Sequence, residues 1–423
     1  MANEIVFSQN HIPGIADIAT YLDNGGYRSL DKALGMTPDE LIEIVKDSGL
    51  RGRGGAGFPT GMKWSFVPKD TPKPRYLVCN ADESEPGTFK DNELMLVNPH
   101  QIVEGMILAC HAIGSQQGYI YIRGEFVEHI RAVSGAIEQA YEKGLLGENI
   151  RGTGVTVHLA VHPGAGAYIC GEESALLNSL EGERGLPRLK PPFPAVSGLY
   201  GCPTIINNVE TLANVPHIVN NGARWFRQWG TERSPGTKVV SVSGHVNNPG
   251  NFEVPLGTPM MQIINDLAGG VRKGHTLKAV IPGGSSVPML AASECDIAFD
   301  YESIAAAGSM LGSAGLIVMD DSTCMVWAAR NLLHFYRHES CGKCAPCREG
   351  TDWLYKTLAR IEETGGSESD IDLLLDICDN MDGKCFCPLG EAAIAPVISS
   401  ISKWRDEYLA HTAHGGCPMR REP

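Results

Sequence analysis

The sequence lacks the features that mark a membrane-spanning or secreted protein. No apolar run in its 423 residues approaches the roughly 18 residues that a membrane-spanning helix needs. The first residues, Met1-Ala2-Asn3-Glu4, have neither the basic region nor the apolar region of a secretory signal peptide. We therefore expect a cytoplasmic chain without direct membrane insertion.

Positive charge is also scarce. The chain has 35 Lys and Arg residues against 49 Asp and Glu residues, a formal net charge of -14. Nucleic acids and anionic membranes bind proteins through clustered Lys and Arg, so we expect neither as the main partner. The composition is that of a folded globular protein, and the length suggests roughly two to four domains.

Strand and helix patterns alternate in the first half of the chain. This alternation predicts a parallel sheet covered by helices. The expected strands lie at 75–80, 119–123 and 155–162, and the expected helices at 38–47, 101–113, 127–143 and 174–180.

The second half shows two further patterns. A hairpin at 239–245 and 251–254, a helix at 259–268 and a strand at 277–281 predict a small ubiquitin-like or β-grasp domain. Beyond residue 320 the pattern is all helical and predicts a four-helix bundle, with helices at 322–339, 351–363, 370–380 and 391–410. We expect a disordered tail from His414.

Thirteen cysteines without a secretory signal indicate metal ligands and buried small side chains rather than a disulfide framework. The strongest motif is Cys341-Gly-Lys-Cys344-Ala-Pro-Cys347, whose thiols can bind one face of an iron–sulfur cluster. Cys387 is the preferred fourth ligand, because Pro388 follows it as in bacterial ferredoxin motifs, and Cys385 competes with it. A structural zinc site is the alternative, although zinc more often uses two Cys-x-x-Cys pairs.

A glycine-rich loop occupies Gly52–Gly57. It formally fits the dinucleotide pattern G-x-G-x-x-G, but a helix ending at Gly49 precedes it where a strand is required. The following residues, Phe58-Pro59-Thr60-Gly61, are not expected to begin a regular helix immediately. We interpret the loop as flat backbone on which a ring system lies, with a flexible surface loop as the alternative.

Three polar segments follow expected strands. Cys79–Gly87 lies beyond the first strand, where open parallel sheets bind ligands, but also fits a solvated acidic turn. Gly164–Glu173 joins a strand to a helix as phosphate-binding loops do, although Glu172 and Glu173 would equally complement a helix dipole. Asn207 and Asn208 offer two amides, for a ligand or as a helix cap.

Taken together, these segments closely resemble the NADH-binding flavoprotein subunit of respiratory complex I over nearly the whole chain. The resemblance rests on five motifs in order: Arg51–Gly61, Cys79–Gly87, Tyr168–Glu173, Asn207–Thr211 and Ser340–Gly350. It implies a multidomain α/β protein with a 1–60 helical and glycine-loop segment, a Rossmann-like parallel-sheet FMN domain at 61–235, a soluble-ligand-binding (SLBB) β-grasp domain at 236–320, a four-helix bundle with a 4Fe-4S cluster at 321–413, and a tail at 414–423.

The resemblance also implies which residues bind the cofactors. FMN would be held by Gly52, Gly54, Gly55, Ala56, Lys63, Asn80, Asp82, Glu83, Gly171, Glu172, Asn207, Asn208 and Thr211. NADH would stack over the flavin, with Phe58 and Phe66 near the adenine and Glu85, Tyr168, Glu173, Lys190 and Phe193 completing the pocket. The cluster ligands would be Cys341, Cys344, Cys347 and Cys387. We expect Glu85 and Glu173, the candidate catalytic residues, to orient the nicotinamide.

The implied activity is oxidation of NADH by hydride transfer to FMN and passage of single electrons to the cluster. The implied partners are a thioredoxin-like 2Fe-2S subunit and a large multi-cluster subunit, with the membrane arm contacted only indirectly. The chain would then be peripheral on the cytoplasmic face of the inner membrane. The alternatives are a diaphorase subunit of an NAD-reducing hydrogenase or formate dehydrogenase, which often carries extra domains not seen here, and a zinc-stabilised assembly protein.

Overall fold

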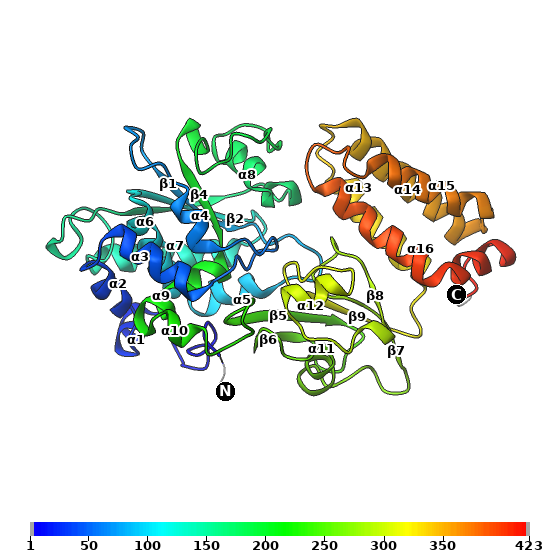
Figure 1. Ribbon diagram of the computed structural model, residues 1–423, viewed down its shortest axis with the longest axis horizontal. Coiled ribbons are helices and arrows are strands. Elements are labelled where there is room, and N and C mark those ends of the chain that lie inside the picture. The colour runs from blue at the N-terminus through cyan, green and yellow to red at the C-terminus, as the bar shows by residue number, and fades with distance from the viewer. Residues whose placement is uncertain (1–3, 420–423) are drawn as a thin grey trace. The chain divides into compact units, whose positions relative to one another are not determined.

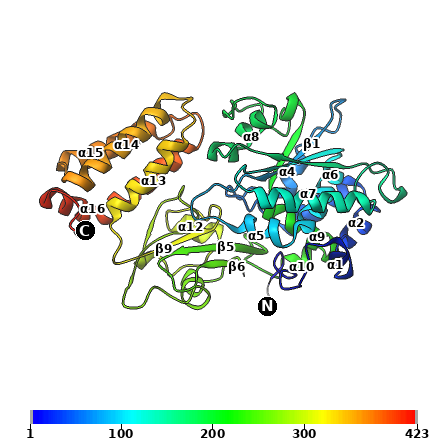
Figure 2. The ribbon, with the colours of Figure 1, turned by 180° about the vertical axis from the view of Figure 1, so that it is seen from behind.

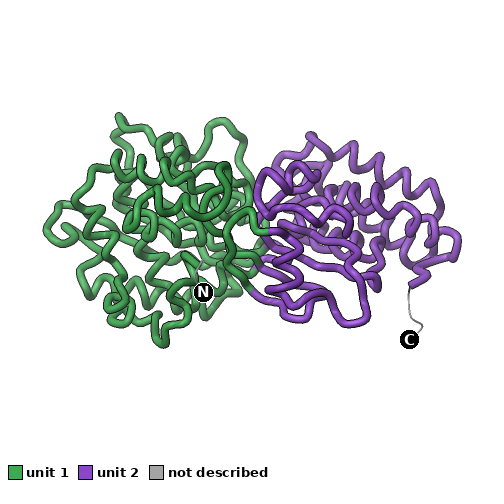
Figure 3. Tube along the Cα trace, turned by 60° about the horizontal axis from the view of Figure 1, so that its bottom comes forward, with its two compact units in different colours: residues 1–84, 89–240, 251–258 green, residues 85–88, 241–250, 259–423 purple. Residues whose placement is uncertain are grey.

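The computed structural model describes residues 4–419, and the chain divides into two compact units. Figure 3 colours the first unit green and the second purple. The first comprises residues up to 84, 89–240 and 251–258, and the second comprises 85–88, 241–250 and the residues from 259 onward. The N-terminal helical segment thus shares a unit with the first sheet, and the second sheet's later strands share a unit with the helical bundle.

The first unit contains the predicted parallel sheet, with the strand order β3-β2-β1-β4. The strands are β1 (Tyr76–Ala81), β2 (Gln117–Ile122), β3 (His158–Pro163) and β4 (Thr204–Asn208). Apolar side chains such as Leu77, Ile120 and Ile205 are buried in them, as strands covered by helices require. The strand β4 was not predicted, and it brings Asn208 level with Asn80 of β1 at the carboxyl edge.

Helices cover this sheet, and α6 (Pro99–Ile113), α7 (Val127–Glu142) and α9 (Val209–Asn221) pack directly against its strands. Figure 2 shows α7 in front. A capping box of Thr37 and Glu40 begins α3, and Gly49 ends it in the left-handed conformation. The other helices of this unit are α1 (Ile18–Asp23), α2 (Arg28–Ala33), α3 (Pro38–Ser48), α4 (Thr60–Ser65), α5 (Lys90–Val97), α8 (Glu173–Leu180) and α10 (Ala223–Phe226).

The second sheet has the order β6-β5-β9-β7-β8. Its strands are β5 (Thr237–Gly244), β6 (Gly250–Pro255), β7 (Leu277–Ile281), β8 (Leu290–Ala291) and β9 (Gly315–Asp320). The strands β5 and β9 are parallel, whereas β7 and β9 are antiparallel, so the sheet is mixed. The predicted helix at 259–268 is a short α11 (Met260–Gln262) followed by a π-helical turn at Ile263–Leu267, and α12 (Tyr301–Ala306) precedes β9.

The four-helix bundle is present (Figure 1) and consists of α13 (Met325–Glu339), α14 (Ala345–Thr364), α15 (Glu368–Met381) and α16 (Leu389–His414). The helix α14 begins six residues before the predicted start, because Pro346 in its first turn favours helix initiation. Within α16 the backbone leaves the helical region at Trp404, so this helix is broken before its last turns.

The expectation of disorder from His414 is wrong for the first residues of the tail. The backbone N–H of Gly416 donates to the carbonyl of His411 at 3.1 Å, and that of Cys417 donates to the carbonyl of Glu362 at 3.0 Å. Residues 420–423 lie outside the described part of the chain. Among residues 4–419, no helix combines the length and the apolar character needed to cross a membrane.

Candidate functional site

The glycine-rich loop lies against the end of β4 and the start of α9. The N–H of Arg53 donates to Thr211 Oγ1 at 2.8 Å, and a Cβ placed on Gly54 would lie 2.9 Å from the Cβ of Asn208. A Cβ on Gly55, by contrast, would meet nothing within 4 Å. The loop therefore fits closely on one side and presents bare backbone on the other, the shape that a flat ring needs.

The prediction that no helix begins directly after this loop is wrong, because α4 begins at Thr60. Pro59 occupies the cap position with extended backbone, and a proline can precede a first turn without losing an intrahelical hydrogen bond. The helix α4 carries Lys63 and Trp64. The Trp64 indole N–H donates to Asn207 Oδ1 at 2.8 Å, which links the helix to β4.

The acidic segment after β1 shapes the carboxyl edge of the sheet. The Asn80 amide donates to the carbonyl of Gly171 at 2.9 Å, and so joins two of the predicted motifs. The carboxylate of Glu83 accepts the N–H groups of Asp91 and Asn92 at 2.8 and 2.9 Å, at the start of α5. Burial, together with the neighbouring Asp91, raises the pKa of Glu83 to about 7. Glu83 therefore fixes a helix rather than lying in a solvated turn.

Asn208 caps a helix, as one of its two predicted roles requires. Its Oδ1 accepts the N–H of Glu210 at 3.1 Å, in the first turn of α9, and also contacts Lys90 Nζ at 3.2 Å. Its Nδ2 donates to Asp91 Oδ2 at 2.6 Å. Asn208 thus uses its amide to hold β4, α5 and α9 in register beneath the glycine-rich loop.

Two lysines and two glutamates form a connected group at the start of α8. Glu172 caps this helix by accepting the N–H groups of Ser174 and Ala175, at 3.0 and 2.9 Å. Lys190 Nζ lies 2.8 Å from both Glu172 and Glu173. Lys63 contacts Glu173 at 3.2 Å. Although burial acts in the opposite direction, these lysines lower the pKa of Glu173 below its ordinary value.

Three aromatic side chains of the predicted NADH pocket are unusually exposed. Phe58, Phe66 and Phe193 expose 45%, 51% and 58% of their surface. The rings of Phe58 and Phe66 are tilted neighbours, with centroids 6.0 Å apart. Large aromatic groups are normally buried, so exposed rings of this kind offer surfaces for stacking.

Glu85 differs from the other predicted residues because it belongs to the second unit. Its carboxylate accepts the Ser285 hydroxyl at 3.0 Å and the N–H of Ser286 at 2.8 Å. The remaining predicted flavin and NADH residues belong to the first unit: Gly52, Gly54, Gly55, Ala56, Phe58, Lys63, Phe66, Asn80, Asp82, Glu83, Tyr168, Gly171, Glu172, Glu173, Lys190, Phe193, Asn207, Asn208 and Thr211.

A buried charge network beside this edge was not predicted. Lys90 Nζ lies 2.7 Å from Asp91 and 2.9 Å from Glu210, and Lys238 pairs with the same Glu210.

Arg53 is fully buried, and its Nε and Nη1 have no hydrogen-bond partner among residues 4–419. An anionic group such as a phosphate would satisfy these two nitrogens. Only Arg53 and Glu210 lie in recognised motifs, and these motifs are far apart in the sequence, so no local pattern pointed to the network.

The cysteine triplet lies where α14 begins. Cys341 and Cys344 are half-buried, and Cys347 is buried in the first turn of the helix. The N–H of Phe386 donates to Cys344 Sγ at 3.4 Å, so the connection between α15 and α16 lies against the triplet. This connection carries both Cys385 and Cys387. The structure thus brings together the segments of all the predicted ligands, and the choice between Cys385 and Cys387 stays a prediction.

These arrangements fit the two implied cofactors. The glycine backbone and the unsatisfied guanidinium nitrogens suit a flavin mononucleotide with its planar ring and its phosphate. Thiols gathered from the start of α14 and the connection before α16 suit an iron–sulfur cluster, which is held by cysteine thiolates.

Three family models match the chain. They are the Nuo51 FMN-binding domain at residues 45–217, the SLBB domain at 238–311, and the NADH-ubiquinone oxidoreductase-F iron-sulfur binding region at 327–411. The family models thus assign an FMN-binding domain, an SLBB domain and an iron–sulfur region to this chain, in the order that was predicted.

Curated relatives match over almost the full length. The F subunit of NADH-quinone oxidoreductase from Mycobacterium bovis is 59% identical over 398 residues, which cover 93% of this chain and 89% of the relative. The F subunit from Streptomyces coelicolor is 56% identical, with 94% and 89% covered, and the F 2 subunit from Rhizobium meliloti is 54% identical, with 95% and 96% covered.

A solved structure of an NAD+-reducing [NiFe]-hydrogenase in the H2-reduced state also matches, with a TM-score of 0.83 and 36% identity. The match covers 93% of this chain and 66% of that chain, so this chain spans about two thirds of the hydrogenase chain. With identities above 50% over nearly the whole chain and an FMN-binding domain, SLBB domain and iron–sulfur region in order, the protein belongs to the family of NADH-quinone oxidoreductase F subunits.

Proposed function

We propose that this chain is the NADH-oxidising subunit of a quinone-reducing respiratory complex. The observation that carries the proposal is the glycine-rich loop, packed closely on Asn208 and Thr211 and bare at Gly55. When bound, FMN accepts two electrons from NADH as a hydride and releases them one at a time, which an iron–sulfur cluster requires. The chain's own residues bind, orient and shield the reactants.

The group formed by Lys63, Glu172, Glu173 and Lys190 orients the dinucleotide. Each carboxylate of this group contacts at least one lysine, so the side chains are held in place before a ligand arrives. Phe58 and Phe66 offer ring faces for the adenine. Arg53, with its two unsatisfied nitrogens, is a further candidate contact for the flavin phosphate.

The four-iron cluster is held by Cys341, Cys344, Cys347 and Cys387 in this proposal. A bound cluster would supply single-electron transfer, and the proposed partners that would receive these electrons are a thioredoxin-like 2Fe-2S subunit and a large multi-cluster subunit. The chain then lies on the cytoplasmic face of the inner membrane and reaches the membrane arm only through these partners.

The first test is the visible absorption spectrum of the anaerobically purified protein before and after NADH, with flavin, iron and zinc quantified on the same sample. Flavin bands that NADH bleaches, with about four iron atoms per chain, are the expected result. A folded preparation that contains zinc but no reducible flavin contradicts the proposal.

A substitution at Gly54 tests the flavin site itself. In Gly54→Val the side chain meets Asn208 and displaces the loop, so we expect flavin content to fall at least about tenfold, or about 1.4 kcal/mol of binding free energy. Gly135→Ala is the matched control, because a Cβ there meets nothing within 4 Å. Full flavin content in Gly54→Val would refute the role of the loop.

The fourth cluster ligand is decided by two parallel variants. We expect Cys387→Ser to lower the iron content and to alter the electron paramagnetic resonance signal of the reduced cluster, and Cys385→Ser to leave both unchanged. The reverse result assigns the ligand to Cys385.

Glu173 offers a separate test at the nicotinamide end. Because Glu173 anchors both Lys63 and Lys190, Glu173→Gln is expected to change the affinity for NAD+ measured by titration calorimetry. Unchanged affinity for the product excludes this role.

The hydrogenase match favours one second candidate, a diaphorase subunit of an NAD-reducing hydrogenase. The proteins that copurify with the chain from its own organism distinguish the two. Quinone-reductase subunits support the first proposal, and hydrogenase subunits support the second.

A further inference from the structure

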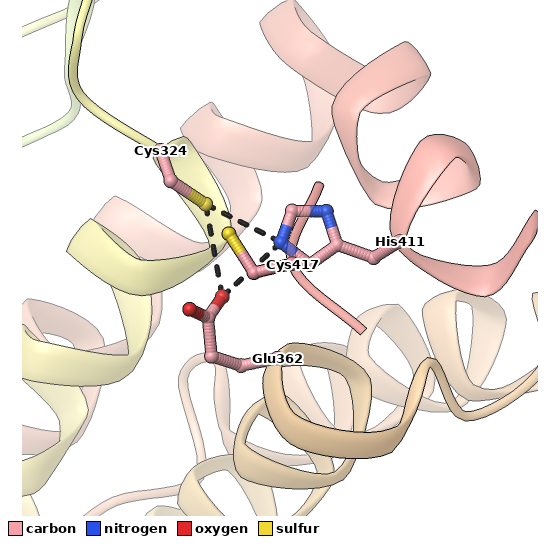
Figure 4. Close-up of side chains that lie close together, drawn as sticks. All are labelled: Cys324, Glu362, His411 and Cys417. Atoms are coloured by element: carbon pink, nitrogen blue, oxygen red, sulfur yellow. Dashed lines mark hydrogen bonds and ion pairs between the residues drawn. The ribbon is translucent and has the colours of Figure 1, made fainter. Parts of the chain in front are cut away.

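Four side chains with metal-binding atoms meet at the end of the bundle opposite the cysteine triplet. They are Cys324, just before α13, Glu362 near the end of α14, His411 near the end of α16, and Cys417 beyond α16 (Figure 4). Their ligand atoms all lie within 4.8 Å of one another. We propose that these four residues bind one zinc ion.

The distances among the ligand atoms of Cys324, Glu362 and His411 match those of a tetrahedral site. Cys324 Sγ lies 3.3 Å from His411 Nε2 and 3.6 Å from Glu362 Oε2, and these two atoms are 3.1 Å apart. Zinc bonds of roughly 2.0 to 2.3 Å at tetrahedral angles place neighbouring ligand atoms about 3.3 to 3.8 Å apart. The three observed edges agree with this figure to within a few tenths of an ångström.

The histidine is oriented as a metal ligand. Its Nδ1 lies 2.6 Å from the carbonyl of Glu407, which can only accept a hydrogen bond, so Nδ1 carries the proton. In Figure 4 the other nitrogen, Nε2, points at the thiol of Cys324 and the carboxylate of Glu362. A backbone carbonyl that fixes the ring in this way is the common second contact of zinc-binding histidines.

Burial excludes solvent from the group. Cys324, Glu362 and His411 expose 7%, 6% and 1% of their surface, and Cys417 is half-buried. With zinc bound, the two cysteines would be thiolates, and their negative charge together with that of the carboxylate would be balanced by the cation. Two sulfur ligands, one imidazole and one carboxylate, with no open position, suit structural zinc, whereas calcium and magnesium prefer oxygen ligands.

The site is independent of the iron–sulfur cluster. Along α14, Glu362 lies roughly 22 Å from Cys347 at about 1.5 Å per residue, which is too far for shared ligands. The zinc would tie the start of α13 to the ends of α14 and α16. It would also hold the ordered first residues of the tail, where Cys417 donates its N–H to the carbonyl of Glu362. The inference does not rest on the proposed NADH oxidation.

The test is the metal content of the full-length holoprotein, purified anaerobically from cells grown with zinc and measured by mass spectrometry. Cys417→Ser removes a ligand outside any helix, and Cys378→Ser is the control, because that buried thiol of α15 lies outside the four-residue group. We expect about one zinc per chain in the wild type and in Cys378→Ser, none in Cys417→Ser, and equal iron in all three.

Two further measurements distinguish the loss of a zinc ligand from misfolding and identify the atoms that bind the zinc. Zinc-edge X-ray absorption is expected to show two sulfur and two lighter ligands, and a zinc chelator is expected to lower the melting temperature of the wild type but not of Cys417→Ser. A zinc-free wild type with a Cys324–Cys417 disulfide in its peptide map overturns the proposal. Zinc that persists in Cys417→Ser and disappears in Cys344→Ser overturns it too, because that zinc occupies the cysteine triplet.

Discussion

Two buried glutamates, one in each unit, are surrounded by different kinds of groups. In the first unit, Glu210 is fully buried and contacts Lys238 and, at 2.9 Å, Lys90. In the second unit, Glu362 is 6% exposed and contacts a thiol and an imidazole. Arg330, the nearby guanidinium, forms its ion pair with the adjacent Glu363 at 2.6 Å.

The difference shows how a buried ion-pair network can be told from a candidate metal site. Burial alone would raise the pKa of Glu210, but Lys238, Lys90 and Arg53 together lower it, so this carboxylate is ionised and its charge is balanced by protein cations. The group around Glu362 consists of atoms that metals bind. The chemical types of the neighbours, and not the burial of the carboxylate, separate the two cases.

The largest expected effect comes from breaking the balanced network. Glu210→Gln removes the carboxylate that Lys238, Lys90 and Arg53 share, so we expect a loss of about 3–5 kcal/mol of stability. Differential scanning calorimetry of the holoprotein measures this loss as a fall in the melting temperature.

A double variant shows whether charge balance is the cause. Glu210→Gln combined with Lys238→Met removes one buried charge of each sign, and we expect it to melt at a higher temperature than Glu210→Gln alone. Equal melting temperatures would mean that the lost packing matters more than the uncompensated charge.

A third buried carboxylate, Glu253, extends the comparison because its hydrogen-bond donors are backbone and hydroxyl groups. It accepts the N–H groups of Ile5, Val6 and Phe7, at 2.9, 3.1 and 2.8 Å, and the hydroxyl of Thr237. Burial outweighs these donors and raises the pKa of Glu253 to about 7.

The sign of the resulting pH dependence follows from this raised pKa. Between about pH 4.5 and 7 the folded state holds a proton that the unfolded state has lost, so stability falls as the pH rises through this window. The contribution is on the order of 3 kcal/mol for a shift of this size. The Glu253→Gln variant has no group that titrates at this position. Its amide oxygen is a poorer acceptor for the four donors, which we expect to cost about 1 kcal/mol of stability.

We therefore expect Glu253→Gln to melt at a lower temperature than the wild type at pH 5. The difference between the two melting temperatures is expected to shrink or reverse by pH 8. A constant difference between the two melting temperatures from pH 5 to pH 8 would show that the carboxylate is already ionised at pH 5 in the folded protein.

The smallest expected effect is at an exposed ion pair that, like the buried pair of Glu210 and Lys238, joins a carboxylate to a lysine. Lys69 and Asp39 are 2.7 Å apart, with side chains 70% and 65% exposed. Asp39→Asn is expected to change stability by less than about 1 kcal/mol, because water screens both charges. A loss as large as that of Glu210→Gln would mean that contact distance matters more than burial.

Residues close together in the sequence account for what could be predicted. Cys341, Cys344 and Cys347 occupy a single short segment, and regular spacing of apolar residues marks helices such as α6 and α13. The parallel sheet and the helical bundle follow from the same patterns, together with the family resemblance.

Contacts between distant residues account for what was missed. The strand β4 is short and ends in two asparagines, which resemble a helix start more than a strand. Cys324, Glu362, His411 and Cys417 come from segments nearly a hundred residues apart at the extremes, so no spacing connects them. Arg53, Lys90 and Lys238 likewise meet only in three dimensions.

The hydrogen bonds of Glu253 to the N-terminus have a consequence for the order of events during synthesis. Ile5, Val6 and Phe7 are buried and depend on an acceptor more than 240 residues later in the chain. At roughly 5–20 residues per second, a ribosome needs about 12–50 s to reach that residue. For this interval the backbone N–H groups and apolar side chains of these three residues lack the partner that they have in the folded protein.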